Sequence, residues 1–154
     1  MKIKIGDAAP LFCLPASDGS SFCLSDMKGK KVILYFYPKD MTPGCTTEAC
    51  NFRDYQSEFN QLNAVIVGVS KDTIARHLKF IQKYQLPFLL LSDENQKVCE
   101  QYGVWQLKKL AGKEYMGIVR STFIIDEEWK ILHIYSKVRV KDHIEDILSF
   151  LQYS

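Results

Sequence analysis

The sequence of 154 residues contains no uninterrupted apolar run near the roughly 18 residues that a membrane-spanning helix needs, so we expect no membrane partner. Neither sign of charge dominates, because 20 Lys and Arg stand against 18 Asp and Glu. No block of basic residues stands out, which argues against nucleic-acid binding. The first residues, MKIKIGDAAPLF, lack the apolar run of a secretory signal, so we expect a cytoplasmic protein.

Internal repeats, low-complexity tracts and linkers are also absent, and the length suits one domain over residues 1–154. Apolar residues make up 47% and charged residues 25%, the usual balance of a globular protein. The five cysteines are odd in number, which argues against a complete disulfide framework. In the cytoplasm we expect them to be reduced at rest.

Alternating strand and helix signals predict an α/β fold with a central mixed sheet flanked by helices. Apolar runs rich in β-formers predict buried strands at 31–37, 64–70 and 88–92, parallel and joined by right-handed crossovers. Apolar residues spaced by three or four predict helices after Cys45 as far as residue 62, and at 73–85, 94–103 and 143–153. Two antiparallel pairs complete the prediction: an N-terminal hairpin of 11–14 with 21–24, and 121–126 with 131–138.

Cys45 lies where a buried strand turns into a helix. Thr42 suits the N-cap and Pro43 the first helical position, which places Cys45 in the first turn. Backbone N–H groups without helical partners and the helix dipole favour a thiolate there. The alternative is an inert, buried cysteine in a capped helix; the tight turn and the nearby Cys50 favour the reactive one.

Metal binding is a poor explanation for Cys45 and Cys50. Their C-x4-C spacing lacks a second pair at zinc spacing, and no histidine is close in sequence. Cys13 and Cys23 are ten residues apart in the predicted hairpin. We expect neither a metal ion nor an organic cofactor.

A permanent disulfide between Cys45 and Cys50 is also disfavoured. In an ideal helix their Cα atoms lie about 8–9 Å apart, whereas a disulfide needs less than about 7 Å. The first helical turns would have to unwind before the bond could form. This suits a bond that forms and breaks in a cycle.

The segment YPKDMTPGCTTEAC resembles the active-site segment of peroxiredoxins of the Q branch, also called bacterioferritin-comigratory proteins. The shared pattern P-x-x-x-T-x-x-C is formed by Pro38, Thr42 and Cys45, and Cys50 stands at the position of the Q-branch partner cysteine. The family's arginine is matched by Arg120, and Trp129 stands near where the family often has glycine. Further matching segments are IGDAAPLFCLPASDG, VIVGVSKD, LSDENQKVCEQYGVW and GIVRSTFIID.

This resemblance implies a thioredoxin-like fold and thiol-dependent reduction of hydrogen peroxide and organic hydroperoxides. Cys45 would be the peroxidatic cysteine, which becomes a sulfenic acid, and Cys50 would resolve it to a disulfide that thioredoxin reduces. The remaining cysteines lie outside the family pattern, and we expect them to fill the core: Cys13, Cys23 and Cys99. We expect a monomer or a weak dimer.

Lowering the pKa of a thiol does not by itself explain fast peroxide reduction. A drop to about 6 gives roughly 30 times more thiolate at neutral pH, but reduced nucleophilicity loses roughly 10- to 18-fold. The site must therefore stabilise charge on the leaving oxygen. Arg120, the Thr42 hydroxyl and the backbone N–H groups of Gly44 and Cys45 are the expected donors, and Pro38 is expected to shield the thiolate from water.

Arg120 is expected beside Cys45 because strand 121–126 should run antiparallel to 31–37. Glu48 could hydrogen-bond near the site or act on the helix dipole, and we favour the second role. No catalytic role is predicted for the histidines, His77, His133 and His143, or for Tyr35 and Tyr37, which are interpreted as packing residues.

Two alternative functions remain open. A thioredoxin-like disulfide oxidoreductase would have C-x-x-C after the buried strand and a proline before the antiparallel strand, where this chain reads RST. A redox sensor without enzymatic turnover would use Cys45 oxidation to unwind the helix and change partners.

Overall fold

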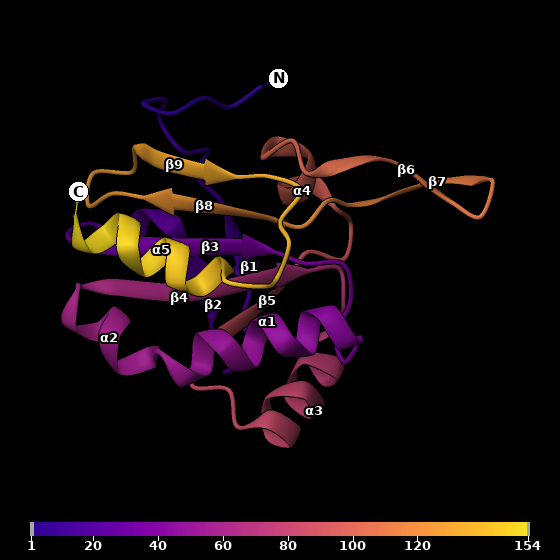
Figure 1. Ribbon diagram of the computed structural model, residues 1–154, viewed down its shortest axis with the longest axis horizontal. Helices are drawn as coiled ribbons and strands as arrows, with labels where there is room; N and C mark the ends of the chain where they lie inside the picture. The colour runs from indigo at the N-terminus through magenta and orange to yellow at the C-terminus, as the bar shows by residue number, and fades with distance from the viewer. Residues whose placement is uncertain (1, 154) are drawn as a thin grey trace.

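Five strands form the central sheet of the computed structural model, which describes residues 2–153 (Figure 1). They are β3 (Lys31–Phe36), β4 (Ala64–Ser70), β5 (Leu89–Ser92), β8 (Ser121–Ile125) and β9 (Ile131–Tyr135), in the spatial order β5-β4-β3-β8-β9. β3, β4 and β5 are parallel, while β8 runs antiparallel to both β3 and β9. The predicted mixed sheet is therefore confirmed.

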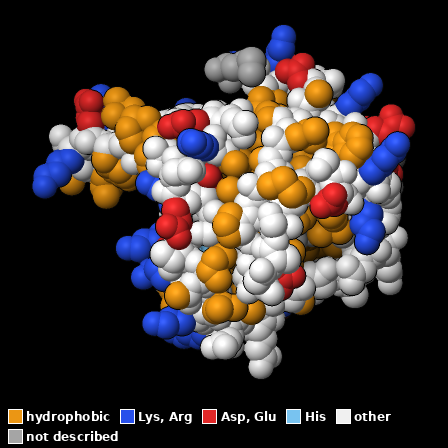
Figure 2. Space-filling view, turned by 180° about the vertical axis from the view of Figure 1, so that it is seen from behind, with side chains coloured by type: hydrophobic (Ala, Val, Ile, Leu, Met, Phe, Trp, Pro, Cys, Tyr) orange, Lys and Arg blue, Asp and Glu red, His pale blue; other side chains and the backbone are white. Residues whose placement is uncertain are grey.

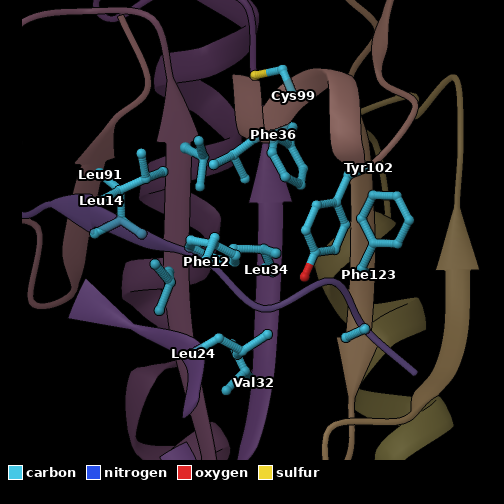
Figure 3. Packing of buried hydrophobic residues seen from close by; sticks show 14 of the residues in the cluster. Phe12, Leu14, Leu24, Val32, Leu34, Phe36, Leu91, Cys99, Tyr102 and Phe123 are labelled. Atoms are coloured by element: carbon cyan, nitrogen blue, oxygen red, sulfur yellow. The ribbon is translucent and has the colours of Figure 1, made fainter. Parts of the chain in front are cut away.

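Alternate residues of β3 enter two separate cores. Val32, Leu34 and Phe36 pack on one face with the N-terminal hairpin and α4 (Lys97–Gln101), as Figure 3 shows for the residues that it labels. Ile33 and Tyr35 pack on the other face with the remaining helices: α1 (Pro43–Asp54), α2 (Gln56–Gln61), α3 (Ile74–Tyr84) and α5 (His143–Gln152). The unbroken apolar run of β3 follows from burial on both faces.

The long helix predicted after Cys45 is divided at Tyr55. Tyr55 ends α1 and precedes α2, with φ −108° and ψ 15°. Phe52 before the break and Phe59 after it are both fully buried in the same core. The apolar spacing predicted the buried side chains correctly but not the break between them.

The N-terminal hairpin pairs β1 (Cys13–Pro15) with β2 (Ser21–Cys23), followed by a short 3-10 helix at Leu24–Met27. The prediction that Cys13 and Cys23 fill the core is wrong, and so is the expectation that they are reduced. Strand alternation turns Leu14 and Phe22 inward, so that Cys13 is exposed and Cys23 half-buried. Their sulfurs form a disulfide. Cys99 is fully buried, as predicted.

A second hairpin occupies residues for which the sequence predicts no element. β6 (Trp105–Leu110) pairs with β7 (Lys113–Ile118), and Ala111 and Gly112 form the turn with φ of 51° and 79°. This hairpin projects from the body of the molecule and carries apolar and basic side chains (Figures 1 and 2). Leu107, Leu110, Tyr115 and Met116 are exposed.

The turn between β8 and β9 places Trp129 in a backbone conformation that side chains rarely adopt. Trp129 adopts a left-handed conformation with φ 63°, which glycine reaches more easily. Its indole Nε1–H donates to the carbonyl of Leu24 at 2.8 Å. The Asp126 carboxylate accepts from the N–H groups of Glu128 and Lys130 at 2.8 and 2.9 Å.

Within residues 2–153, no helix has both the length and the apolar character that crossing a membrane would require.

Candidate active site

The loop between β3 and α1 places Cys45 in the first turn of a helix. Thr42 is the N-cap residue and Pro43 follows it, as predicted. The Thr42 side chain does not cap the helix, however, because its hydroxyl donates to the carbonyl of Lys39 at 2.8 Å. The hydroxyl oxygen keeps its capacity to accept a hydrogen bond. Pro38 is half-buried at the start of the same loop.

The sheet brings Arg120 to Cys45 across 75 residues of sequence. In the antiparallel register Ser121 stands opposite Phe36, so the residue before β8 meets the end of β3. The Nη2 atom of Arg120 lies 3.3 Å from Sγ of Cys45, which is itself only 1% exposed. The guanidinium therefore lies within hydrogen-bond distance of the sulfur and donates to it.

Glu48 holds the other arm of the guanidinium. Its Oε1 atom accepts from Nη1 of Arg120 at 2.6 Å, and the carboxyl group is fully buried. Burial raises the pKa of Glu48 to about 7, although the charge of Arg120 opposes this rise. The expectation that Glu48 serves chiefly the helix dipole is therefore wrong, since it contacts the arginine directly.

Neighbouring groups favour the positively charged form of Arg120. Burial lowers the pKa of Arg120, but the negative charges of Glu48 and Cys45 raise it by more, and the net shift is upward. Gly44 leaves room for the side chain, because a Cβ atom added there would lie 3.1 Å from Nη2. The guanidinium is thus oriented by one carboxylate and bounded by the helix backbone.

Tyr35 lies beneath this group with its ring stacked on Phe52, 4.7 Å between centroids. Burial, followed by the charges of Glu48 and Cys45, raises the pKa of Tyr35 well above its ordinary value, so the hydroxyl stays protonated. Within the described residues, neither this hydroxyl nor Oε2 of Glu48 has a hydrogen-bond partner. Tyr35 packs as predicted, but it also brings an unpaired donor close to charged groups.

Cys50 lies on α1, five residues beyond Cys45, and is half-buried with a free thiol. The intervening helix is continuous from Pro43 to Asp54. The two cysteines therefore remain separate while α1 is folded, as the helical spacing predicts.

Behind the loop, Asp40 and His77 form a buried pair that sequence reasoning missed. His77 Nδ1 lies 2.6 Å from Oδ2 of Asp40, and Nε2 lies 2.9 Å from the carbonyl of Leu91. Both ring nitrogens of His77 therefore lie within hydrogen-bond distance of a buried oxygen atom. Tyr37 donates to the second Asp40 oxygen at 2.5 Å. This pair fixes the loop just before Thr42.

The same region holds a group of three potential metal ligands, Asp40, Asp72 and His77. Protein groups already engage them: the Asp72 carboxylate accepts from the N–H of Asp40 at 2.8 Å and from the hydroxyl of Ser70 at 2.7 Å. Arg76 also donates to Asp72 at 3.0 Å. The group is therefore explained as an ion-pair network.

The other two histidines contribute to packing. His143 is buried, its Nε2 lies 2.9 Å from the Thr122 hydroxyl, and burial lowers its pKa to about 4. His133 stacks on Phe150 with 4.8 Å between ring centroids. Among the residues described, neither histidine forms a hydrogen bond with Cys45 or Arg120.

Comparison with known proteins identifies the family of the chain. The sequence pattern of the AhpC/TSA family matches residues 5–134. A PrxQ mutant from Xylella fastidiosa superposes with a TM-score of 0.94 at 34% identity, covering 99% of this chain and 98% of that one. Structures of the Xanthomonas campestris bacterioferritin comigratory protein that concern alkyl peroxide reduction give 0.89 at 35% identity, covering 96% and 98%. The chain therefore belongs to the AhpC/TSA family, in the Q branch of the peroxiredoxins.

Curated relatives agree closely in length and sequence. Peroxiredoxin Bcp of Bacillus subtilis (strain 168) is 55% identical over 152 residues, which cover 99% of this chain and 97% of that protein. Peroxiredoxin Bcp of Escherichia coli (strain K12) is 43% identical over 150 residues, covering 97% and 96%. The chain is accordingly an enzyme, a thiol-dependent peroxidase on a thioredoxin-like fold.

Proposed function

We propose that Cys45 is the peroxidatic cysteine of this peroxiredoxin and that Cys50 resolves it within the same chain. Hydrogen peroxide and organic hydroperoxides are the proposed substrates, and a thioredoxin-like dithiol protein is the proposed reductant. The observation that carries the assignment is the Arg120 guanidinium, 3.3 Å from a sulfur in the first turn of α1.

In the first step the Cys45 thiolate attacks one peroxide oxygen and the O–O bond breaks. The bonding electron pair leaves on the second oxygen, which takes a proton and departs as water or an alcohol, while the sulfur becomes a sulfenic acid. Arg120 is proposed to stabilise charge on that leaving oxygen, since it lies 3.3 Å from the sulfur. Thr42 is proposed to accept the peroxide O–H, because its own hydroxyl proton is donated to the carbonyl of Lys39.

In the second step the Cys50 thiolate attacks the Cys45 sulfenic sulfur, the S–O bond breaks, and hydroxide leaves and takes up a proton to become water. The first turns of α1 must unwind for the two sulfurs to meet. The dithiol reductant then attacks the disulfide and restores both thiols. Pro38 is proposed to limit the access of water to the thiolate before oxidation.

The proposal also covers the localisation, domain organisation, oligomeric state and partners of the enzyme. We place the enzyme in the cytoplasm as one domain over residues 1–154, a monomer or a weak dimer without nucleic-acid or membrane partners. Support comes from the net charge of +2 and from the two cores that share one sheet.

The experiment is peroxide consumption coupled to a thioredoxin system, with mass spectrometry after one equivalent of peroxide. Cys45→Ser should abolish consumption, whereas Cys50→Ser should complete one round of oxidation but recycle poorly. Cys99→Ala is the matched control, since Cys99 is fully buried in the opposite core. Normal turnover of the Cys50 variant with thioredoxin would assign resolution to another residue.

The same protein preparations also test the two alternative functions, a disulfide oxidoreductase and a redox sensor. Insulin reduction faster than peroxide consumption would favour a disulfide oxidoreductase. Oxidation of Cys45 without multiple turnovers in any dithiol system would favour a redox sensor.

A further inference from the structure

We propose that Cys13 and Cys23 form a second redox couple, separate from Cys45, that exchanges electrons with external dithiols while the hairpin stays folded. The hairpin packs Phe12, Leu14 and Phe22 into the core that contains Leu34. Cys45 belongs to the core on the other face of β3. The couple and the peroxidatic site therefore lie on opposite faces of the sheet.

The positions of the two cysteines make the couple accessible. Cys13 stands directly opposite Cys23 in the antiparallel register, and their Cα atoms are 4.1 Å apart. Their neighbours along the strands are buried, so both sulfurs lie on the outward side of the hairpin. Cys13 is exposed, which allows an incoming thiolate to reach its sulfur.

A hollow beside Cys13 offers room for the reacting segment of a partner. It has a volume of about 530 Å³ and lies between residues 11–14 and the α4 region. Asp93, Lys97 and Glu100 contribute polar lining. An extended segment of a dithiol protein resting there would bring its thiol close to the Cys13 sulfur.

The hairpin has supports that do not depend on the disulfide. The turn is closed by the N–H of Gly19 donating to Ala16 at 3.0 Å, and Gly19 has a φ of 87°. The N–H of Ser17 donates to Leu90 of β5 at 2.9 Å, and that of Leu24 to Phe12 at 3.0 Å. These contacts hold the two cysteines together in the dithiol form.

A disulfide stabilises a protein mainly by closing a loop in the unfolded chain, and its effect is smaller for a short loop. Here the loop spans only 10 residues. Reduction should therefore leave the hairpin in place, which distinguishes a redox couple from a structural staple.

Oxidation of the couple uses the substrate of the enzyme itself. The Cys13 thiolate attacks a hydroperoxide and becomes a sulfenic acid, releasing water or an alcohol. The Cys23 thiolate then attacks that sulfur, and hydroxide leaves and takes up a proton. In total, two thiols become one disulfide while one hydroperoxide is reduced.

Reduction runs through a mixed disulfide. A thiolate of the external dithiol attacks the Cys13 sulfur, and Cys23 leaves as a thiolate. The second thiol of the reductant then attacks its own bound sulfur and releases Cys13. The reductant departs as a disulfide, so the electrons balance.

The test uses a Cys45→Ser/Cys50→Ser background, in which the outcome does not depend on the proposed peroxidatic pair. The protein is equilibrated with defined ratios of reduced to oxidised dithiothreitol and alkylated, and intact masses are read. Circular dichroism and the unfolding midpoint are followed in both forms. Adding Cys13→Ser to the background gives the matched control.

The expected result is a titration of two thiols together, with the folded spectrum kept in both forms and re-oxidation by hydrogen peroxide. A disulfide that resists dithiothreitol until the protein unfolds would overturn the proposal in favour of a staple. Thiols that stay reduced after peroxide treatment would overturn it as well.

A second measurement tests whether the couple is separate from catalysis. In the otherwise native chain, Cys13→Ser/Cys23→Ser should retain thioredoxin-coupled peroxidase activity within about twofold. A loss of more than about tenfold with the fold intact would show that the couple belongs to the catalytic cycle, contrary to the proposal.

Discussion

Cys45 and Cys50 share one helix, whereas Cys13 and Cys23 face each other across a hairpin. The two pairs differ in how close the backbone brings their sulfurs and in the charge around them. The hairpin cysteines are brought together by the backbone and are bonded, but no charged donor to either sulfur is recorded in the described chain. The helical cysteines are kept apart by the backbone, yet Cys45 has a guanidinium at 3.3 Å. The backbone brings one pair of sulfurs together, whereas a nearby charge distinguishes one sulfur of the other pair.

The largest effect is expected from His77, which fixes the loop that leads to Cys45. His77→Leu leaves the buried Asp40 carboxylate with Tyr37 but without its histidine partner, and should lower the free energy of unfolding by about 3–5 kcal/mol. Urea unfolding measures this loss. His133→Leu is the control, because His133 is only half-buried and lies outside the pair. Equal losses for both variants would contradict the role assigned to the Asp40–His77 pair.

The next largest effect is expected from Arg120 and tests the difference in local charge between the two cysteine pairs. Arg120→Met removes the only recorded side-chain donor to Cys45 among the described residues and should slow its reaction with hydrogen peroxide by about 100- to 1000-fold. Stopped-flow measurement of a single turnover gives the rate constant. Arg139→Met, at an exposed position, should leave the rate unchanged. An equally active Arg120 variant would place the activating charge elsewhere.

The smallest effect concerns Glu48, whose pKa burial raises to about 7 from 4.5. Folding therefore favours the protonated carboxyl group, which adds stability below about pH 4.5 that is lost as the pH rises through about 7. The free energy of unfolding should fall across this window by about 1–3 kcal/mol relative to Glu48→Gln. Chemical unfolding at pH 5 and pH 8 measures the difference. A Glu48→Gln variant with the same pH dependence as the native chain would assign the effect to other groups.

Much of the fold and part of the site could be predicted from local sequence. The apolar run of β3 is unbroken because both of its faces are buried, and this pattern needs no tertiary information. Arg120 could be placed because antiparallel pairing of β8 with β3 fixes where its preceding residue lies. The N-cap position of Thr42 followed from residue types alone.

The features that were missed depend on contacts between distant segments. Glu48 near a helix start suggests a dipole effect, and only the approach of Arg120 from 72 residues away makes it an ion-pair partner. His77 has polar neighbours in sequence, but its ring meets Asp40 and Leu91 in the interior. β6 and β7 lack a buried face, so their sequence carries little strand periodicity.

The cysteines of the hairpin were misread for a different reason. LFCL and SFCL look like continuous core segments, yet a two-residue alternation buries only every second position. The sequence did contain a signal for the disulfide. The Asp18-Gly19 turn lies between LFCL and SFCL, which are equally long, and this sets Cys13 opposite Cys23.

The break at Tyr55 has a consequence for how far α1 can open. A helix melts cooperatively, so an uninterrupted helix from Thr42 to Leu62 would spread the disruption over the whole segment. The break at Tyr55, with φ −108° and ψ 15°, ends α1 at Asp54 and begins α2 at Gln56. Phe59 can then stay buried in the core, and the opening proposed to join Cys45 to Cys50 would end at Tyr55.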